Sequence, residues 1–196
     1  KDVYGNIYNK SNVVEKEKYY KLPYFVDDDH PFYPQTAYAK SKLVGEYIAE
    51  CHPNYNIIRL SSCYTDFDHY RGHWVPNLIK SIFSEKKIIL TNKGKQIRDL
   101  LHVHDLGQLI DILLKSNKKG LKINVGGGKG NIISILQLLE LFDSDSKIIF
   151  TPGNDYGFVF SNNRVKNKLN WEPKIIFQER LQIIKTNLSQ GVSANK

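Results

Sequence analysis

Methionine is absent from the sequence, even at its first position, although the chain has 196 residues. Because translation begins at methionine, we expect the chain that starts at Lys1 to be a processed product or part of a longer protein. Cysteine is nearly as scarce. Cys51 and Cys63 are too few for a disulfide framework or a cysteine metal cluster, so we expect no metal site and a reducing, cytoplasmic location.

Long hydrophobic runs are missing as well, and the opening stretch "KDVYGNIYNK" is polar. No segment approaches the roughly 18 apolar residues of a membrane-spanning helix, so we expect no membrane partner. The net charge is +8, but the lysines are spread along the chain rather than gathered in one block. That spread argues against a nucleic-acid partner. Hydrophobic residues make up 41% of the chain, which is enough for a packed core.

Helical and strand-like patterns alternate from residue 36 onward, which favours an α/β fold with parallel strand pairing. The expected helices cover 36–50, 73–83, the later part of 102–116, 134–142, 163–169 and 178–188. The expected strands cover 56–62, 87–90, 121–125 and 147–150.

Two helices have recognisable starts. Thr36 is a plausible N-cap for helix 36–50, and Asp105 is one for the helix in "HVHDLGQLIDILLKS". Each helix also has an apolar stripe. The expected stripes consist of Ala37, Leu43, Val44, Tyr47 and Ile48 in the first helix, and Leu106, Leu109, Ile110, Leu113 and Leu114 in the second.

The stretch "TAYAKSKLVGEYIAE" places Tyr38 and Lys42 four residues apart on one helix face. A nearby ammonium favours the phenolate form of a tyrosine, which could then exchange a proton with a sugar hydroxyl while a cofactor takes hydride. The chain has 12 tyrosines and 28 basic residues, so one or two such pairs are expected by chance. Spacing alone leaves both a catalytic pair and a solvated helix face open.

Three other motifs carry weaker signals. "VGGGKGN" (125–131) lacks the glycine of a dinucleotide loop and the Ser/Thr of a phosphate loop, which favours a tight turn with Asn131 or Ser134 capping the next helix. His102 and His104 lack a second ligand cluster, so a core or cap role is favoured. Arg98 could form a surface pair or clamp a diphosphate through its planar fork.

Several segments in order resemble one family. They are "VYG" (3–5), "PQTAYAKSKLVGEYI" (34–48), "IIRLSSCYT" (57–65), "GKQIRDLLHVHDL" (94–106), "INVGGG" (123–128) and "NNRVKNKLNWEPK" (162–174). Together they are similar to the extended short-chain dehydrogenase/reductase family of NAD-dependent nucleotide-sugar epimerases and dehydratases. The resemblance runs from residue 1 to about residue 188, and it is nearest to the CDP-tyvelose/CDP-paratose 2-epimerase branch.

The resemblance implies NAD as cofactor and a nucleotide sugar as substrate. Tyr38 would be the catalytic acid–base, and Lys42 would lower its pKa and bind the nicotinamide ribose. Ser61 would lie near the nicotinamide, and Ser62 near the sugar. The sugar would be oxidised transiently and re-reduced on its other face, as in an epimerase.

The remaining implied contacts concern the substrate and a partner. Asn77 and Leu78 would hold the nucleotide diphosphate, which Arg98 would also bind. Helix 36–50 would form a homodimer contact. A 4,6-dehydratase or reductase of the same family, and a non-catalytic binding protein that keeps the fold, remain as alternatives.

The departures from the family pattern matter equally. The main glycine-rich cofactor loop and the ribose-binding acid are not in this chain, and the family's catalytic Ser/Thr would fall just before Lys1. Thr151 and Pro152 stand where relatives have a nucleotide-binding arginine. We therefore expect the later part of a Rossmann-type parallel sheet (1–72), mostly the small C-terminal substrate-binding domain (73–190) and a frayed tail (191–196), with the N-terminal cofactor-binding half absent.

Overall fold

The computed structural model describes residues 14–16, 19–21, 25–66, 77–78, 81–82, 87–142, 147–153 and 157–193. The "VYG" motif, most of the expected helix 73–83 and the domain boundary predicted at residue 72 lie outside the described residues. The described strands are β1 (Val14–Lys16), β2 (Tyr19–Lys21), β3 (Phe25–Val26), β4 (Asn56–Leu60), β5 (Ser62–Tyr64), β6 (Ile88–Thr91), β7 (Ile97–His102), β8 (Leu121–Val125), β9 (Ile132–Ser134), β10 (Ile148–Thr151) and β11 (Val159–Phe160). The helices are α1 (Ala37–Glu50), α3 (Val103–Lys115), α4 (Ile135–Leu141), α5 (Asn163–Leu169) and α6 (Phe177–Ser193), with short 3-10 turns η2 (Asn92–Gly94) and η3 (Lys129–Asn131).

Most strand pairs are parallel, as the alternating pattern predicts. Strand β4 pairs with β8, β5 with β7, β6 with β10 and β3 with β11, all in parallel. The antiparallel pairs are β1–β2 and β7–β9. The fold is therefore α/β with parallel strands joined by helical crossovers, which confirms the predicted fold class.

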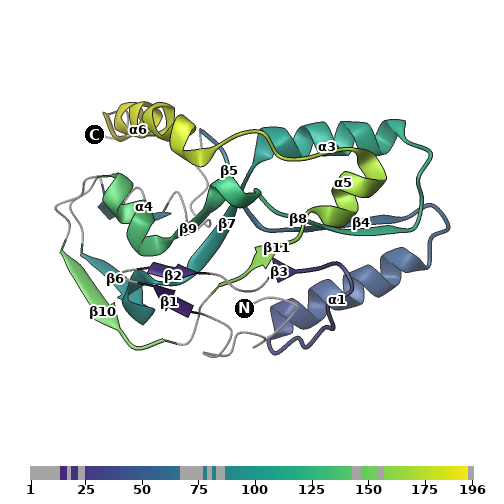
Figure 1. The fold of residues 1–196 in the computed structure, drawn as a ribbon, viewed down its shortest axis with the longest axis horizontal. Coiled ribbons are helices and arrows are strands. Elements are labelled where there is room, and N and C mark those ends of the chain that lie inside the picture. The colour runs from purple at the N-terminus through teal and green to yellow at the C-terminus, as the bar shows by residue number, and fades with distance from the viewer. Residues whose placement is uncertain are drawn as a thin grey trace.

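Strands β4 and β8 form the middle of a three-layer region. Figure 1 shows α1 on one side of this strand pair and α3 with α5 on the other. The side chains between β8 and the two upper helices form a continuous apolar core, which includes Leu109, Leu113, Ile123, Val125 and Val165. This packing fixes the end of β8, from which the chain enters the glycine turn.

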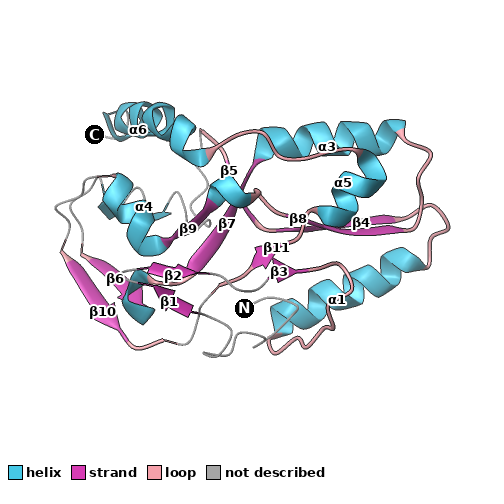
Figure 2. Cartoon of the chain, viewed as in Figure 1, coloured by secondary structure: helices cyan, strands magenta, loops and turns pink. Residues whose placement is uncertain are grey.

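A second region surrounds β6, β7 and α4, and Figure 2 shows it at the opposite end of the molecule from α1. Its core includes Leu90, Leu100, Leu138, Phe177 and Ile184. Phe177 and Ile184 come from α6, so the C-terminal helix covers this core. Among the residues that the structure describes, no helix is long and apolar enough to cross a membrane.

Helix α1 begins where the sequence predicts. Thr36 is its N-cap, because the Thr36 hydroxyl accepts a hydrogen bond of 3.1 Å from the Ala39 amide. Its predicted apolar stripe, however, is largely exposed: Val44, Tyr47 and Ile48 are 53%, 58% and 67% exposed. Ala39 is the buried residue of this helix.

The predicted N-cap of α3 is wrong. His102 occupies that position, and its Nδ1 accepts a hydrogen bond of 3.1 Å from the His104 amide. Asp105 lies in the first turn instead, and its carboxylate accepts hydrogen bonds from the Lys174 and Ile175 amides rather than from an amide of α3.

Two further expectations differ from the structure. Ile110 and Leu114, assigned to the apolar stripe of α3, are 41% and 80% exposed, so the buried stripe of this helix is narrower than predicted. Helix α6 continues to Ser193, three residues into the segment expected to be a tail.

Candidate functional site

Tyr38 and Lys42 lie together in the first turns of α1. The Lys42 Nζ is 5.2 Å from the centroid of the Tyr38 ring, which is within the range of a cation–π contact. Tyr38 is 65% exposed, and Lys42 is also exposed. Both side chains can therefore contact a molecule that lies outside this helix.

Ser61 and Ser62 follow the carboxyl end of β4. Figure 1 shows α1 running toward one edge of the molecule and β4 returning from it, so the first turn of α1 is on the side where β4 ends. The Ser61 amide donates to the Val125 carbonyl at 3.0 Å, while the Ser61 Oγ is buried without a hydrogen-bond partner. In open parallel sheets, ligands bind beyond the carboxyl ends of the strands.

The predicted diphosphate residues share one pocket. Asn77, Leu78 and Arg98 line a cavity of about 460 Å³, together with Lys87 and Gln96. Arg98 lies on β7, half-buried, and its Nη1 donates a hydrogen bond of 2.8 Å to the Ile97 carbonyl. Lys87 and Gln96 were not singled out from the sequence, since nothing in their local pattern marks them as pocket residues.

The glycine turn after β8 packs tightly against β7. The Gly127 amide donates a hydrogen bond of 2.6 Å to the Asp99 carboxylate, and a Cβ on Gly127 would lie 1.8 Å from the Leu100 carbonyl oxygen. The amide thus has a buried partner, and the partner is a carboxyl group that would repel a phosphate. The interpretation as a tight turn is confirmed, and Ser134 caps α4 in a reciprocal capping box with Gln137.

Asp99 is the most perturbed carboxyl group near this turn. It is 2% exposed, and burial raises its pKa to about 6, while hydrogen bonds from the Phe160 and Gly127 amides act in the opposite direction. Because these two amides belong to β11 and to the glycine turn, Asp99 links both segments to β7.

A second buried polar cluster connects β7 to α6. Arg180 on α6 donates from two nitrogens to the Asp66 carboxylate, and this contact holds the pKa of Asp66 below its usual range. His102 Nε2 lies 3.5 Å from the same carboxylate, and burial lowers the pKa of His102. Among the described residues no group of three or more His, Cys, Asp or Glu could hold a metal ion.

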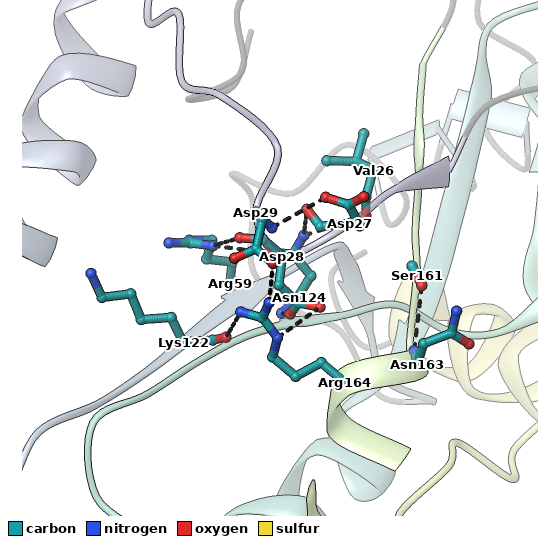
Figure 3. A network of polar contacts seen from close by, with 10 residues as sticks. All are labelled: Val26, Asp27, Asp28, Asp29, Arg59, Lys122, Asn124, Ser161, Asn163 and Arg164. Carbon is teal, nitrogen blue, oxygen red and sulfur yellow. Dashed lines mark hydrogen bonds and ion pairs between the residues drawn. The ribbon is translucent and has the colours of Figure 1, made fainter. Parts of the chain in front are cut away.

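Sequence reasoning missed a polar network, which Figure 3 shows between β4, β8, α5 and the loop after β3. Arg59 donates to the Asp28 carbonyl, and the Asn124 side chain donates to the carbonyls of Val26 and Asp27. Asp28 is buried, which raises its pKa despite the nearby Arg164. One signal was present: a lone arginine in the apolar strand "NIIRL" must find buried acceptors.

Relatives with known names resemble this chain. The dTDP-glucose 4,6-dehydratase of Xanthomonas campestris pv. campestris (strain B100) is 24% identical over 172 residues, which cover 78% of this chain and 49% of the relative. The dTDP-glucose 4,6-dehydratase 1 of Escherichia coli (strain K12) is 23% identical over 198 residues, which cover 92% of this chain and 54% of the relative. The chain thus spans about half the length of the curated relatives it matches.

Solved structures support the same fold. The UDP-glucuronic acid 4-epimerase from Bacillus cereus, in complex with UDP-glucuronic acid and NAD, has a TM-score of 0.78 at 21% identity and covers 96% of this chain and 59% of its own. The dTDP-glucose 4,6-dehydratase from Bacillus anthracis, in complex with NAD, has a TM-score of 0.72 at 24% identity and covers 85% of this chain and 56% of its own.

The family model provides the assignment. The model of the NAD dependent epimerase/dehydratase family matches residues 16–126, which is more than half of the chain. The matched range contains α1 with Tyr38 and Lys42, the serines after β4 and Arg98 on β7. The chain therefore belongs to the NAD-dependent epimerase/dehydratase family.

Proposed function

We propose that this chain supplies the acid–base helix and the nucleotide-sugar pocket of an NAD-dependent enzyme that oxidises a sugar carbon transiently. The observation that carries the proposal is the contact between Tyr38 and Lys42 in the exposed first turns of α1. The named relatives and neighbours are dehydratases and epimerases of nucleotide sugars, which supports this substrate class.

The residues of this chain divide the chemistry. The Tyr38 phenolate accepts the proton of a sugar hydroxyl, and the positive charge of Lys42 stabilises that phenolate. NAD, when bound, takes up the hydride from the same sugar carbon. The exposed positions of Tyr38 and Lys42 suit contact with a ribose and a sugar, whereas the glycine turn at Gly127 does not suit a pyrophosphate because its amide already binds Asp99.

The nucleotide end of the substrate belongs in the pocket beside β7. Arg98 provides a planar, permanently charged group for the diphosphate, and Asn77 and Leu78 line the same cavity. The motif resemblance implies that Ser61 contacts the nicotinamide and that Ser62, the first residue of β5, contacts the sugar, and the position of both serines after the carboxyl end of β4 is compatible with these roles. Two cysteines without a disulfide favour a cytoplasmic location.

For the reaction itself, we propose 2-epimerisation of a CDP-sugar, supported by the motif resemblance, with 4,6-dehydration of a dTDP-sugar as the second candidate, supported by the named relatives. An epimerase returns the hydride to the sugar and loses no water, whereas a 4,6-dehydratase releases water. Proton NMR of the products formed from CDP-, UDP- and dTDP-sugars by the natural protein that carries this sequence separates the two.

The decisive variant is Tyr38→Phe, which removes the phenolic oxygen and keeps the ring. We expect the turnover number to fall by about 100-fold or more, since acid–base groups contribute about 10²–10⁴-fold. Tyr33→Phe is the matched control, because Tyr33 is similarly exposed and lies outside α1. Equal activity of the two variants would show that the chain has another mechanism, or that it is a binding protein without turnover.

We also propose that α1 forms a homodimer contact. Its support is the exposed apolar group of Val44, Tyr47 and Ile48 on one helix. Light scattering of the purified protein is expected to give twice the monomer mass, and Ile48→Glu should shift the protein to the monomer. A wild-type monomer at all concentrations would contradict the contact.

A further inference from the structure

The Arg59 side chain joins three parts of the chain at one point. Its Nε and Nη2 donate hydrogen bonds of 2.9 Å and 2.8 Å to the two carboxylate oxygens of Glu46 on α1. Its Nη1 donates to the Asp28 carbonyl at 3.0 Å and to the Asn124 Oδ1 at 3.5 Å. The guanidinium also lies over the Phe32 ring, 4.7 Å from its centroid.

These contacts are protected from water. The Arg59 and Glu46 side chains are 7% and 12% exposed, so their ion pair is not a solvent-screened surface pair. Figure 3 shows Arg59 beside Asp28 and Asn124, with Arg164 approaching the same group from α5. Loss of the guanidinium would therefore leave the Glu46 carboxylate largely buried without its ionic partner.

Among the residues that the structure describes, helix α1 buries little apolar surface of its own. Its buried residue is Ala39, while Val44, Tyr47 and Ile48 are exposed in this chain. A second ion pair, between Lys122 and Glu50, ties the end of the helix to β8, but its side chains are 34% and 29% exposed. The Arg59–Glu46 pair is thus the more buried of these two ionic links from α1 to the strands.

Glu46 lies on the same helix as the proposed catalytic pair, Tyr38 and Lys42. Glu46 follows Lys42 by one helical turn and Tyr38 by two, so the three residues lie along the same side of α1. We propose that Arg59 is a positioning residue: its two-pronged contact with Glu46 sets where α1 presents Tyr38 and Lys42 to the sugar. This inference rests on the proposed function and deepens it.

An arginine is required rather than any cation. The two parallel hydrogen bonds to one carboxylate fix an orientation as well as a distance, which a lysine ammonium cannot reproduce. Arg59→Lys keeps the charge and removes the fork, so it separates orientation from charge. Glu46→Gln tests the same contact from the helix side, because the amide keeps one acceptor and loses the charge.

The first measurement is amide hydrogen exchange, which needs no activity. In Arg59→Lys and Glu46→Gln, exchange of the α1 amides at residues 41–46 should speed up by about 100-fold relative to the α3 amides. Leu109→Ala is the stability control, because Leu109 is fully buried in α3 and belongs to a core that does not include α1. That control should speed up α3 exchange at least as much as α1 exchange.

The second measurement is steady-state kinetics on the natural protein that carries this sequence, with NAD and its nucleotide sugar. Arg59→Lys should lower kcat by about 100-fold with KM nearly unchanged, because misplacing an acid–base group by about 1 Å costs that much. Leu109→Ala, assayed below its unfolding temperature, should keep the wild-type kcat.

The outcomes are distinguishable. If α1 exchange in Arg59→Lys equals that of wild type, Arg59 does not anchor the helix and the inference is wrong. It is equally wrong if α1 loosens while kcat stays at the wild-type value. If Tyr38→Phe has the wild-type kcat, both the proposed function and the positioning role are wrong. If Tyr38→Phe is inactive while Arg59→Lys has full activity, only the positioning role is wrong.

Discussion

Asp99 makes the stability of this chain depend on pH in a direction opposite to that of a typical ion-paired carboxylate. Its pKa is raised from the ordinary 3.8 to about 6 by burial. The folded state therefore binds a proton more readily than the unfolded chain, so stability decreases as the pH rises from about 4 to about 6. The difference between the two pKa values corresponds to a change of about 3 kcal/mol in the free energy of unfolding between the fully protonated and the fully ionised forms of Asp99.

The variant that isolates this effect is Asp99→Asn, which cannot titrate. The Asp99 oxygens accept from the Gly127 and Phe160 amides, so an asparagine keeps one of these bonds and leaves the other amide facing an NH₂ group. That loss costs about 1–3 kcal/mol at every pH. The titration of Asp99 adds a pH-dependent part to this difference. When the pH falls from about 7.5 to about 4.5, the free energy of unfolding of the wild type should rise by about 2 kcal/mol relative to that of the variant.

Urea unfolding followed by circular dichroism at a series of pH values measures the difference between the two proteins. Asp28 and Asp66 titrate in both proteins, so their contributions cancel in that difference. Asp111→Asn is the control, because Asp111 is exposed and forms an ion pair with Lys115 on the surface of α3. A difference between wild type and Asp99→Asn that does not change with pH would refute the assignment of the raised pKa to Asp99.

Two further predictions concern helix ends and the glycine turn. His102 caps α3 through an unprotonated Nδ1, and burial lowers its pKa below the ordinary 6.5, so the unfolded chain binds a proton more readily than the folded chain. Stability should therefore fall as the pH drops below about 6.5. His102→Ala should cost about 1 kcal/mol and reduce this pH dependence in urea titrations, whereas an unchanged pH profile would contradict the prediction. Gly127→Ala should prevent folding or lower the melting temperature strongly, because its Cβ would lie 1.8 Å from the Leu100 carbonyl oxygen. Gly107→Ala, with nothing within 4 Å, should instead stabilise α3 by up to about 1 kcal/mol, and equal melting temperatures of the two variants would show the turn to be adaptable.

The local features of this fold could be predicted from the sequence. The Thr36 cap, the cap at Ser134 (one of two candidates, with Asn131) and the strand "LKINV" depend on neighbours within a few residues, and the structure contains all three. The cap at Asp105 was wrong for the opposite reason. Its carboxylate binds the amides of Lys174 and Ile175, about 70 positions away, and no local pattern reports such a partner.

The same limit applies to the candidate site. The spacing of Tyr38 and Lys42 is a local property, and the pair is in contact in the structure. The role of Arg59 could not be read from "NIIRL", because its partners come from α1, from the loop after β3 and from β8. Short strands such as β3 and β11 were missed too, since a two-residue strand has no periodicity to detect.

Buried polar side chains help to hold short segments of this fold in place. Asp99 accepts a hydrogen bond from the Phe160 amide of β11, Asp105 from the Ile175 amide and Asn131 from the Phe177 amide. A buried amide without a partner is costly, so each of these side chains stabilises the position of the segment whose amide it binds. These segments are thereby held from inside the molecule, while Tyr38 remains exposed. An exposed Tyr38 on a packed scaffold is compatible with the proposed proton transfer from a sugar hydroxyl.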